Sequence, residues 1–355
     1  MWIQIALTAL AVALIPLAVI VWSKDQNKHR KLIFVTLTLT FELIMFGAFT
    51  RLTDSGLGCP DWPGCYGQSN PLLSHADIRA AEIAMPHGPV TLQKAWIEMV
   101  HRYLAMSVGI LIIIQLAVAL WRWRRYGDSP WSSAFLLFFV CLQGAFGAWT
   151  VTLRLQPVIV TTHLLLGMGL LALLALQAEQ FRSKTLPVIS KKLLWPLRLA
   201  LLVLFMQIAL GGWVSTNYAA LACHDYPLCN GSLLPDMDWQ HGFSLWRQLG
   251  QTSSGEYLPF TALVTIHWAH RSFAWLVVLV AGFAAWRVRR EAALANLANW
   301  VLIALGVQVA IGISTVFFAW PLLLAVLHNG GAASLVLLLS MLNYRAMRAS
   351  RAAVL

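Results

Sequence analysis

Residues 58–67 read Gly-Cys-Pro-Asp-Trp-Pro-Gly-Cys-Tyr-Gly, and residues 222–231 read Ala-Cys-His-Asp-Tyr-Pro-Leu-Cys-Asn-Gly. The two stretches share both cysteines, the aspartate, a proline and the final glycine at a constant offset of 164 residues. At an offset of 165, Gln143, Gly147 and Thr150 match Gln308, Gly312 and Thr315. The chain therefore contains a tandem duplication, and two halves of similar structure are expected.

The composition places both copies of the repeat in a membrane. Of the 355 residues, 59% are hydrophobic and 11% are charged, whereas a soluble domain carries about 25% charged residues. Several apolar runs are long enough to cross a bilayer. They lie near residues 2–22, 32–50, 96–120, 134–152, 158–178, 194–214, 260–286, 296–318 and 321–343. These nine runs predict an all-α polytopic membrane protein.

The repeat divides these spans into two equal groups and one extra span. We expect two tandem four-helix transmembrane bundles, residues 32–181 and 182–355, related by pseudo-two-fold symmetry. Residues 1–31 form an extra N-terminal span and a cytoplasmic loop outside the repeat. This span lacks a basic n-region, and its apolar run is long for a signal peptide, so we expect it to be retained.

The net charge of +11 reports membrane orientation. Lysine and arginine gather in alternate gaps between the spans, and the positive-inside rule places such gaps in the cytoplasm. The pattern predicts a multi-pass bacterial inner-membrane protein in contact with lipid, with a periplasmic N-terminus, a cytoplasmic C-terminus and no nucleic-acid partner. The basic gaps hold Lys24, Lys28, Arg30 and Lys31; Arg122, Arg124 and Arg125; Arg182, Lys184, Lys191, Lys192 and Arg198; Arg287, Arg289 and Arg290; and Arg345, Arg348 and Arg351.

Four histidines lie near the outer ends of four spans that are all expected to run inward: His101, His163, His270 and His328. At 1.5 Å per residue, each is expected roughly 8–15 Å below the outer face. Ionisable side chains inside a membrane are rare and usually functional, although a single one can be a hydrogen-bonded packing residue. Imidazole is a common axial ligand of haem iron, whereas a non-haem metal site would add nearby carboxylates or thiolates. The two matched pairs, one in each copy, therefore predict two haem sites.

The two copies differ by one acid. Glu98 lies three residues before His101 on the same helix face, and the second copy has His267 before His270. A carboxylate beside a haem edge could take protons or stabilise a cation during substrate oxidation. The alternatives are that Glu98 orients His101 or pairs with Arg102. For His267 we expect a structural role. The other interpretations are that it supports an iron ligand or is itself an alternative ligand.

The loop cysteines are expected on the oxidising side of the membrane. Cys59 with Cys65, and Cys223 with Cys229, therefore predict disulfides that close a loop over each copy's histidines. Redox-active thiols and a metal clip are alternatives, but the spacing suits neither common pattern. Cys141, inside the span near 134–152, is expected to be a small core residue.

Several other polar residues lie near or within the expected spans. Arg51, Arg102, Arg154 and Arg271 lie toward the outer side, where arginine could bind haem propionates bidentately; snorkelling of these side chains to the interface is the alternative. Glu42 and Gln207 are expected to be buried polar residues. For Glu42, bonding to a neighbouring helix is favoured over a proton path.

Together these residues resemble the haem A synthase family, over nearly the whole chain after the first span. The resemblance is carried by Arg51-Leu-Thr-Asp-Ser-Gly-Leu-Gly-Cys-Pro-Asp-Trp-Pro, Glu98-Met-Val-His-Arg, Thr162-His163, His270-Arg271 and Leu327-His328-Asn. It implies an eight-helix core that oxidises the C8 methyl group of haem O to a formyl group, giving haem A for terminal oxidases. The ninth span departs from that core.

The resemblance also implies a role for each site. His101 and His163 would bind the substrate haem O with Glu98 as the essential acid, and His270 and His328 would bind a haem b cofactor that relays electrons. Haem O synthase and terminal oxidase assembly factors are candidate partners, and a homo-oligomer is compatible with the sequence. A cytochrome b-type membrane electron carrier and a haem transporter or chaperone are the alternative functions.

Overall fold

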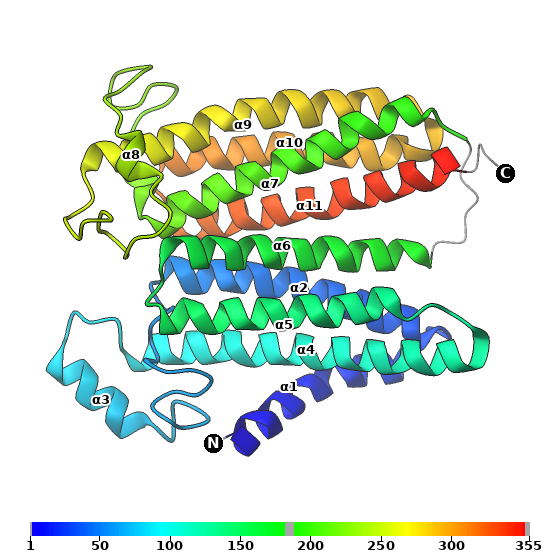
Figure 1. The fold of residues 1–355 in the computed structure, drawn as a ribbon, viewed down its shortest axis with the longest axis horizontal. Helices are drawn as coiled ribbons and strands as arrows, with labels where there is room; N and C mark the ends of the chain where they lie inside the picture. The colour runs from blue at the N-terminus through cyan, green and yellow to red at the C-terminus, as the bar shows by residue number, and fades with distance from the viewer. Residues whose placement is uncertain (1, 182–187, 352–355) are drawn as a thin grey trace. The chain divides into compact units, whose positions relative to one another are not determined.

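The computed structural model describes residues 2–181 and 188–351. Arg182 and Lys184, which belong to the predicted basic gaps, lie outside the described residues, as does the predicted start of the second bundle. By their internal contacts, the residues form two compact units, 1–155 and 156–355, and each is described by itself. Helices make up the regular structure of the described residues in both units (Figure 1).

The described residues contain nine helices that are long and apolar enough to cross a membrane, which confirms the predicted all-α membrane fold. In the first unit they are α1 (Trp2–Trp22), α2 (Lys28–Leu52), α4 (Leu92–Tyr126) and α5 (Trp131–Thr152). In the second unit they are α6 (Pro157–Gln180), α7 (Leu194–Thr216), α9 (Phe260–Val288), α10 (Ala292–Phe317) and α11 (Leu322–Arg351). Two shorter helices, α3 (His75–Ala84) and α8 (Trp239–Gly242), lie in the long loops and were not predicted.

Local capping signals extend α4 beyond its predicted span at both ends. At the start, Thr91 Oγ1 accepts a hydrogen bond of 3.2 Å from the Lys94 N–H, as an N-cap residue does. At the end, Gly127 adopts a left-handed conformation with φ 78°, and its N–H donates to the Trp123 carbonyl. These signals are independent of hydrophobicity, so the apolar run underestimates the length of the helix.

In the first unit, α4 packs against α1, α2 and α5. On α1, Ala9 and Ala13 are buried one turn apart, and such small side chains let helices approach closely. Between α4 and α2, Gln115 Nε2 donates to Thr36 Oγ1 at 2.8 Å, and both residues are buried. Small residues and a buried hydrogen bond therefore join these helices, as is common inside a membrane.

In the second unit, α7 packs against α6, α9 and α11, and α10 packs against α9 and α11. The last turn of α6 is tied to α11 by a largely buried ion pair, in which the Arg345 guanidinium donates to both oxygens of Glu179 at 2.7 Å. Nearby, Asn343 Nδ2 donates to the Leu197 carbonyl on α7 at 3.0 Å. These contacts group α6 with the C-terminal helices. The predicted bundles 32–181 and 182–355 have a different boundary from the observed units and stay a prediction.

Two predictions of burial were wrong. Cys141 is exposed on α5 rather than packed in a core, and Glu42 is exposed on α2. The hydrophobicity of a membrane helix identifies the span, but in a helix that is apolar on all sides it does not identify the face that contacts other helices.

The ion pair between α6 and α11 provides a test of packing in the second unit. Removing one partner of a buried ion pair costs about 3–5 kcal/mol, because the remaining charge loses its counterpart in a low dielectric. We expect Arg345→Met and Glu179→Gln each to lower the thermal unfolding midpoint of the purified protein in detergent. The unfolding midpoint of the double variant should fall by much less than the sum of the two single decreases. Additive losses in this double-mutant cycle would contradict a direct coupling.

Candidate functional site

A disulfide and an aspartate shape the loop that follows α2. Cys59 and Cys65 are bonded, with their Cα atoms 4.9 Å apart. Inside this loop, the Asp61 carboxylate accepts hydrogen bonds from the N–H groups of Tyr66 at 2.6 Å and Gly67 at 2.7 Å. Both donors have a positive φ, which glycine adopts without strain. We call residues 59–67 the first cysteine loop.

The loop that follows α7 is built in the same way. Cys223 and Cys229 are bonded, with Cα atoms 4.7 Å apart, and Asp225 accepts from the N–H groups of Asn230 at 2.5 Å and Gly231 at 2.9 Å. The hydrogen bonds from Gly231 and Asn230 hold the pKa of the Asp225 carboxyl below its usual value. We call residues 223–231 the second cysteine loop. Both predicted disulfides are present, and the repeated sequence builds the same loop twice.

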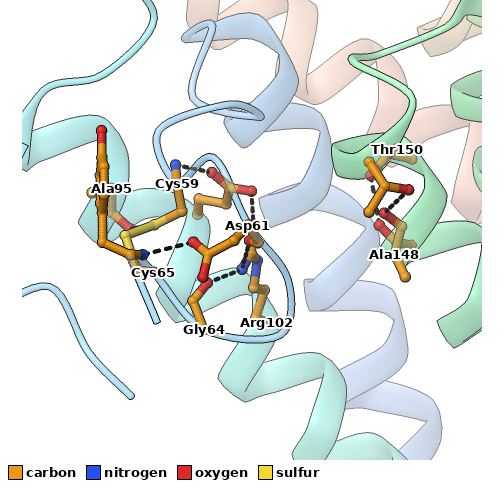
Figure 2. A network of polar contacts seen from close by, with 12 residues as sticks. Cys59, Asp61, Gly64, Cys65, Ala95, Arg102, Ala148 and Thr150 are labelled. Carbon is orange, nitrogen blue, oxygen red and sulfur yellow. Dashed lines mark hydrogen bonds and ion pairs between the residues drawn. A yellow bond between two sulfur atoms is a disulfide. The ribbon is translucent and has the colours of Figure 1, made fainter. Parts of the chain in front are cut away.

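Glu98 and Arg102 fasten the first cysteine loop to α4. Arg102 Nη1 donates to the carbonyl oxygens of Asp61 at 2.9 Å and Gly64 at 2.5 Å (Figure 2). Arg102 Nη2 forms a buried ion pair of 2.5 Å with Glu98 Oε1, and Glu98 Oε2 accepts a hydrogen bond of 2.8 Å from the Cys59 N–H. One carboxylate therefore connects the helix, the guanidinium and the disulfide loop. The alternative that Glu98 pairs with Arg102 is realised in the structure.

In the second unit, His267 occupies the position of this acid. Its Nδ1 accepts a hydrogen bond of 3.2 Å from the Cys223 N–H. Arg271 Nη2 donates to the carbonyl oxygens of Asp225 and Leu228, both at 2.8 Å. His267 offers no carboxylate, and Arg271 Nη1 is buried without a hydrogen-bond partner among the described residues. His267 thus makes the structural contact that we expected of it, while Arg271 keeps one unused donor.

The remaining outer arginines have other surroundings. Arg51 lies at the end of α2 and pairs with Asp54 at 3.3 Å, and Arg154 is exposed. In the structure, Arg51, Arg102 and Arg271 all contact protein groups. Propionate binding by these residues stays a prediction.

In the second unit, His270 on α9 and His328 on α11 face each other. Their ring centroids are 6.5 Å apart, and the ring planes are inclined by 82°. Metal–imidazole bonds are about 2 Å long, so two such bonds and the two ring radii together span roughly 6 Å. Two glycines lie against these rings: an added Cβ would lie 3.0 Å from His270 Cε1 at Gly211 and 2.9 Å from His328 Cε1 at Gly312. The separation and the space around the rings fit one iron held between two imidazoles.

The other two histidines lie one in each unit. His101 on α4 is close to Phe46, with ring centroids 6.3 Å apart and planes inclined by 14°. An added Cβ at Gly47 on α2 would lie 3.0 Å from His101 Nε2. His163 lies on α6 and is half-buried, as His101 is. All four histidines fall in about the first three turns of their helices. The pairing of His101 with His163 stays a prediction.

Comparison with known proteins identifies the family. The family model for cytochrome oxidase assembly proteins matches residues 30–340. A haem A synthase from Shewanella oneidensis is 40% identical over 319 residues, which cover 88% of this chain and 95% of the relative. The chain belongs to the haem A synthase family. Haem A synthases from Caulobacter sp. strain K31 and Caulobacter vibrioides are 32% and 30% identical, each over 89% of this chain and 95% of the relative. The resemblance found in the sequence is thereby confirmed.

In this haem A synthase family member, two glutamines contact the histidine pair of the second unit. Gln207 Nε2 donates to the His270 carbonyl at 3.1 Å, and Gln308 Nε2 donates to the His328 carbonyl at 2.9 Å. The sequence assigned Gln207 only as a buried polar residue and Gln308 only as part of the repeat. Each glutamine precedes by four residues a glycine that lies against a histidine ring, and this spacing was the available signal.

The cysteine loops provide a second test. In the second cysteine loop, Asp225→Ala removes the acceptor of two backbone N–H groups, and we expect the loop to open more often. Limited reduction followed by thiol labelling and mass analysis should then show the Cys223–Cys229 disulfide reacting several-fold faster than in the unmodified protein.

Asp236→Ala is the matched control, because Asp236 is an exposed aspartate in the same long loop. In this variant the Cys223–Cys229 disulfide should be reduced at the same rate as in the unmodified protein. Equal reduction rates in all three proteins would show that Asp225 does not stabilise the loop.

Proposed function

We propose that this protein oxidises the C8 methyl group of substrate haem O to a formyl group and so produces haem A. Membership of the haem A synthase family supports this function. The observation that carries it is the difference between the two units at one position. A buried, ion-paired carboxylate, Glu98, accepts the Cys59 N–H in the first unit, whereas the neutral ring of His267 accepts the Cys223 N–H in the second. We assign the reactive site to the histidine beside the carboxylate.

At that site, we propose His101 and His163 as the axial ligands of the substrate haem and Glu98 as the acid–base residue. Arg102 and the Cys59 N–H hold both oxygens of Glu98, so the carboxylate has a defined position one turn before His101. Conversion of a methyl group to an alcohol and then to an aldehyde hydrate removes protons and builds positive charge at the reacting carbon. A positioned carboxylate can accept those protons and stabilise that charge.

In the second unit, we propose that His270 and His328 bind a haem b cofactor. When bound, this cofactor would supply one-electron transfer, for which an iron with two histidine ligands is suited. Gly211 and Gly312 leave the ring edges free of side chains. Arg271 is a better candidate than Arg102 for binding a propionate, because its buried Nη1 has no partner among the described residues while Arg102 already binds Glu98.

The same proposal includes the membrane orientation. The basic gaps place the N-terminus in the periplasm and the C-terminus in the cytoplasm of a bacterial inner membrane. Both cysteine loops then face the oxidising side, where disulfides persist. Haem O synthase and terminal oxidase assembly factors remain candidate partners, and self-association remains compatible with the sequence.

An electron carrier and a haem transporter make different predictions. A cytochrome b-type carrier would usually bind haems near both membrane faces, whereas all four histidines here occupy the early turns of helices expected to run in one direction. A transporter or chaperone would bind haem O without changing its mass. Product analysis therefore separates the three functions.

The function can be tested in cells that also express a haem O synthase. Extracted haems should include a species with the mass of the formyl product when this protein is present. Glu98→Gln keeps an oxygen that can accept the Cys59 N–H and keeps the size of the side chain, but it removes the charge. We expect this variant to retain the second-unit haem and to accumulate haem O or the alcohol, with haem A reduced by at least about 100-fold, the lower range for loss of a general acid–base residue.

Glu256→Gln, the same change at an exposed loop glutamate, should leave haem A production unchanged. Full haem A production by Glu98→Gln would refute the catalytic role of this residue. Haem O recovered with no change of mass in cells expressing the unmodified protein would favour the transporter.

The ligand assignment is tested separately. His328→Leu removes one of two proposed iron ligands, and we expect the low-spin haem b absorption spectrum to disappear while the protein is still inserted in the membrane. An unchanged spectrum in correctly inserted protein would exclude His328 as a ligand.

A further inference from the structure

Gln207 touches His270 at two points. It lies on α7 four residues before Gly211, so both face the same neighbour, and Gly211 is the residue against the His270 ring. Gln207 Nε2 lies 3.1 Å from the His270 carbonyl oxygen and 3.1 Å from His270 Nδ1. The amide therefore contacts both the backbone and the ring of this proposed iron ligand.

Gln308 repeats this arrangement on α10. It precedes Gly312, which lies against the His328 ring, and its Nε2 donates to the His328 carbonyl at 2.9 Å. Gly331, one turn after His328 on α11, leaves the space that Gln308 occupies, because an added Cβ there would overlap Gln308 Oε1. Two helices of the second unit thus present the same pair of residues to two different histidines.

Both amides also keep an unused acceptor. Gln207 Oε1 and Gln308 Oε1 are buried without a hydrogen-bond partner among the described residues, and so is His328 Nδ1. A buried polar atom without a partner is costly, so its persistence at two matched positions calls for an explanation. In both glutamines the contact with the histidine is made by the amide nitrogen, and neither oxygen is hydrogen-bonded to a ring nitrogen among the described residues.

The first unit lacks this contact on α2. Gly47 lies against the His101 ring as Gly211 lies against His270, but the residue four positions earlier is Leu43. A leucine side chain has neither a donor nor an acceptor. The glutamine on α7 therefore distinguishes the second unit, whereas Gln308 on α10 has the matching residue Gln143 on α5 of the first unit.

We propose that Gln207 and Gln308 are positioning residues for the two ligands of the haem b site. Each amide donates from Nε2 to the backbone carbonyl of its histidine and so fixes the helix turn from which the ligand projects, and Gln207 Nε2 also lies against the His270 ring. This inference rests on the proposed function of the second unit. Its consequence is a resident haem with two rigidly oriented ligands.

The experiment compares glutamine variants of the full-length protein, purified with its haem. Gln207→Leu introduces the residue that the first unit has at the matching position. We expect its affinity for haem b, measured by transfer of haem to apomyoglobin, to fall by about 10–100-fold. The ferric low-spin electron paramagnetic resonance signal should change, because the amide no longer fixes the orientation of the ligand. Gln308→Leu should behave in the same way.

Gln207→Glu keeps the size of the side chain but removes the amide donor. A carboxylate cannot donate to the His270 carbonyl, so haem affinity and the resonance signal should change in this variant as they do in Gln207→Leu. A residue that only fills space would tolerate this change of similar size. Gln115→Leu is the matched control, because Gln115 is a buried membrane glutamine that bonds to Thr36, and it should leave the haem affinity and the signal unchanged.

The outcomes separate this inference from the function on which it rests. Leucine variants at both positions with unmodified haem affinity and signal would overturn the positioning role and leave the proposed haem b site intact. An unmodified protein that shows no two-histidine haem signal would overturn the site itself, and the inference with it.

Discussion

Each unit is organised by one hydrogen bond. It runs from the N–H of the first cysteine in each loop to a side chain on the following helix, which also carries a histidine. The Cys59 N–H reaches Glu98 on α4, and the Cys223 N–H reaches His267 on α9. One turn later, an arginine on the same helix binds two carbonyl oxygens of the same loop. Because the partner side chain and the histidine lie three residues apart on one helix face, a loop held in this way is also held near the histidine.

The second constraint is the space that an imidazole ring needs between closely packed helices. Gly47, Gly211 and Gly312 each lie on a neighbouring helix, where an added Cβ would lie 3.0, 3.0 and 2.9 Å from a histidine ring, closer than ordinary van der Waals contact. Any larger side chain would have to displace the ring or the helix. Glycine at these positions therefore combines tight helix packing, which membrane helices favour, with a fixed ring position. The same residues that allow packing also define where the rings of the proposed iron ligands lie.

The sequence predicted what depends on length and on the repeat. The nine spans follow from apolar runs long enough to cross a bilayer. The disulfides Cys59–Cys65 and Cys223–Cys229 follow from the expected location of both loops on the oxidising side of the membrane. The sequence predicted less well what depends on which face of a helix is covered. Cys141 and Glu42 were expected to be buried, but both are exposed. The periodicity of hydrophobic residues carries little information in a helix that is apolar on all sides. A contact such as that of Arg102 with the Asp61 carbonyl depends on a loop conformation that composition does not encode.

The duplication makes the differences between the units informative, because the shared scaffold holds everything else constant. The first unit has a carboxylate beside its histidine, and its guanidinium neutralises that carboxylate where an unpaired charge would be very costly. The second unit replaces the acid by an imidazole and has a glutamine on α7 where α2 has Leu43. A charged group suits a site where bonds to a substrate change, whereas neutral amides that orient a ligand suit a site where the bound group stays. These differences between the units are the basis on which we propose a reactive site in the first unit and a cofactor site in the second.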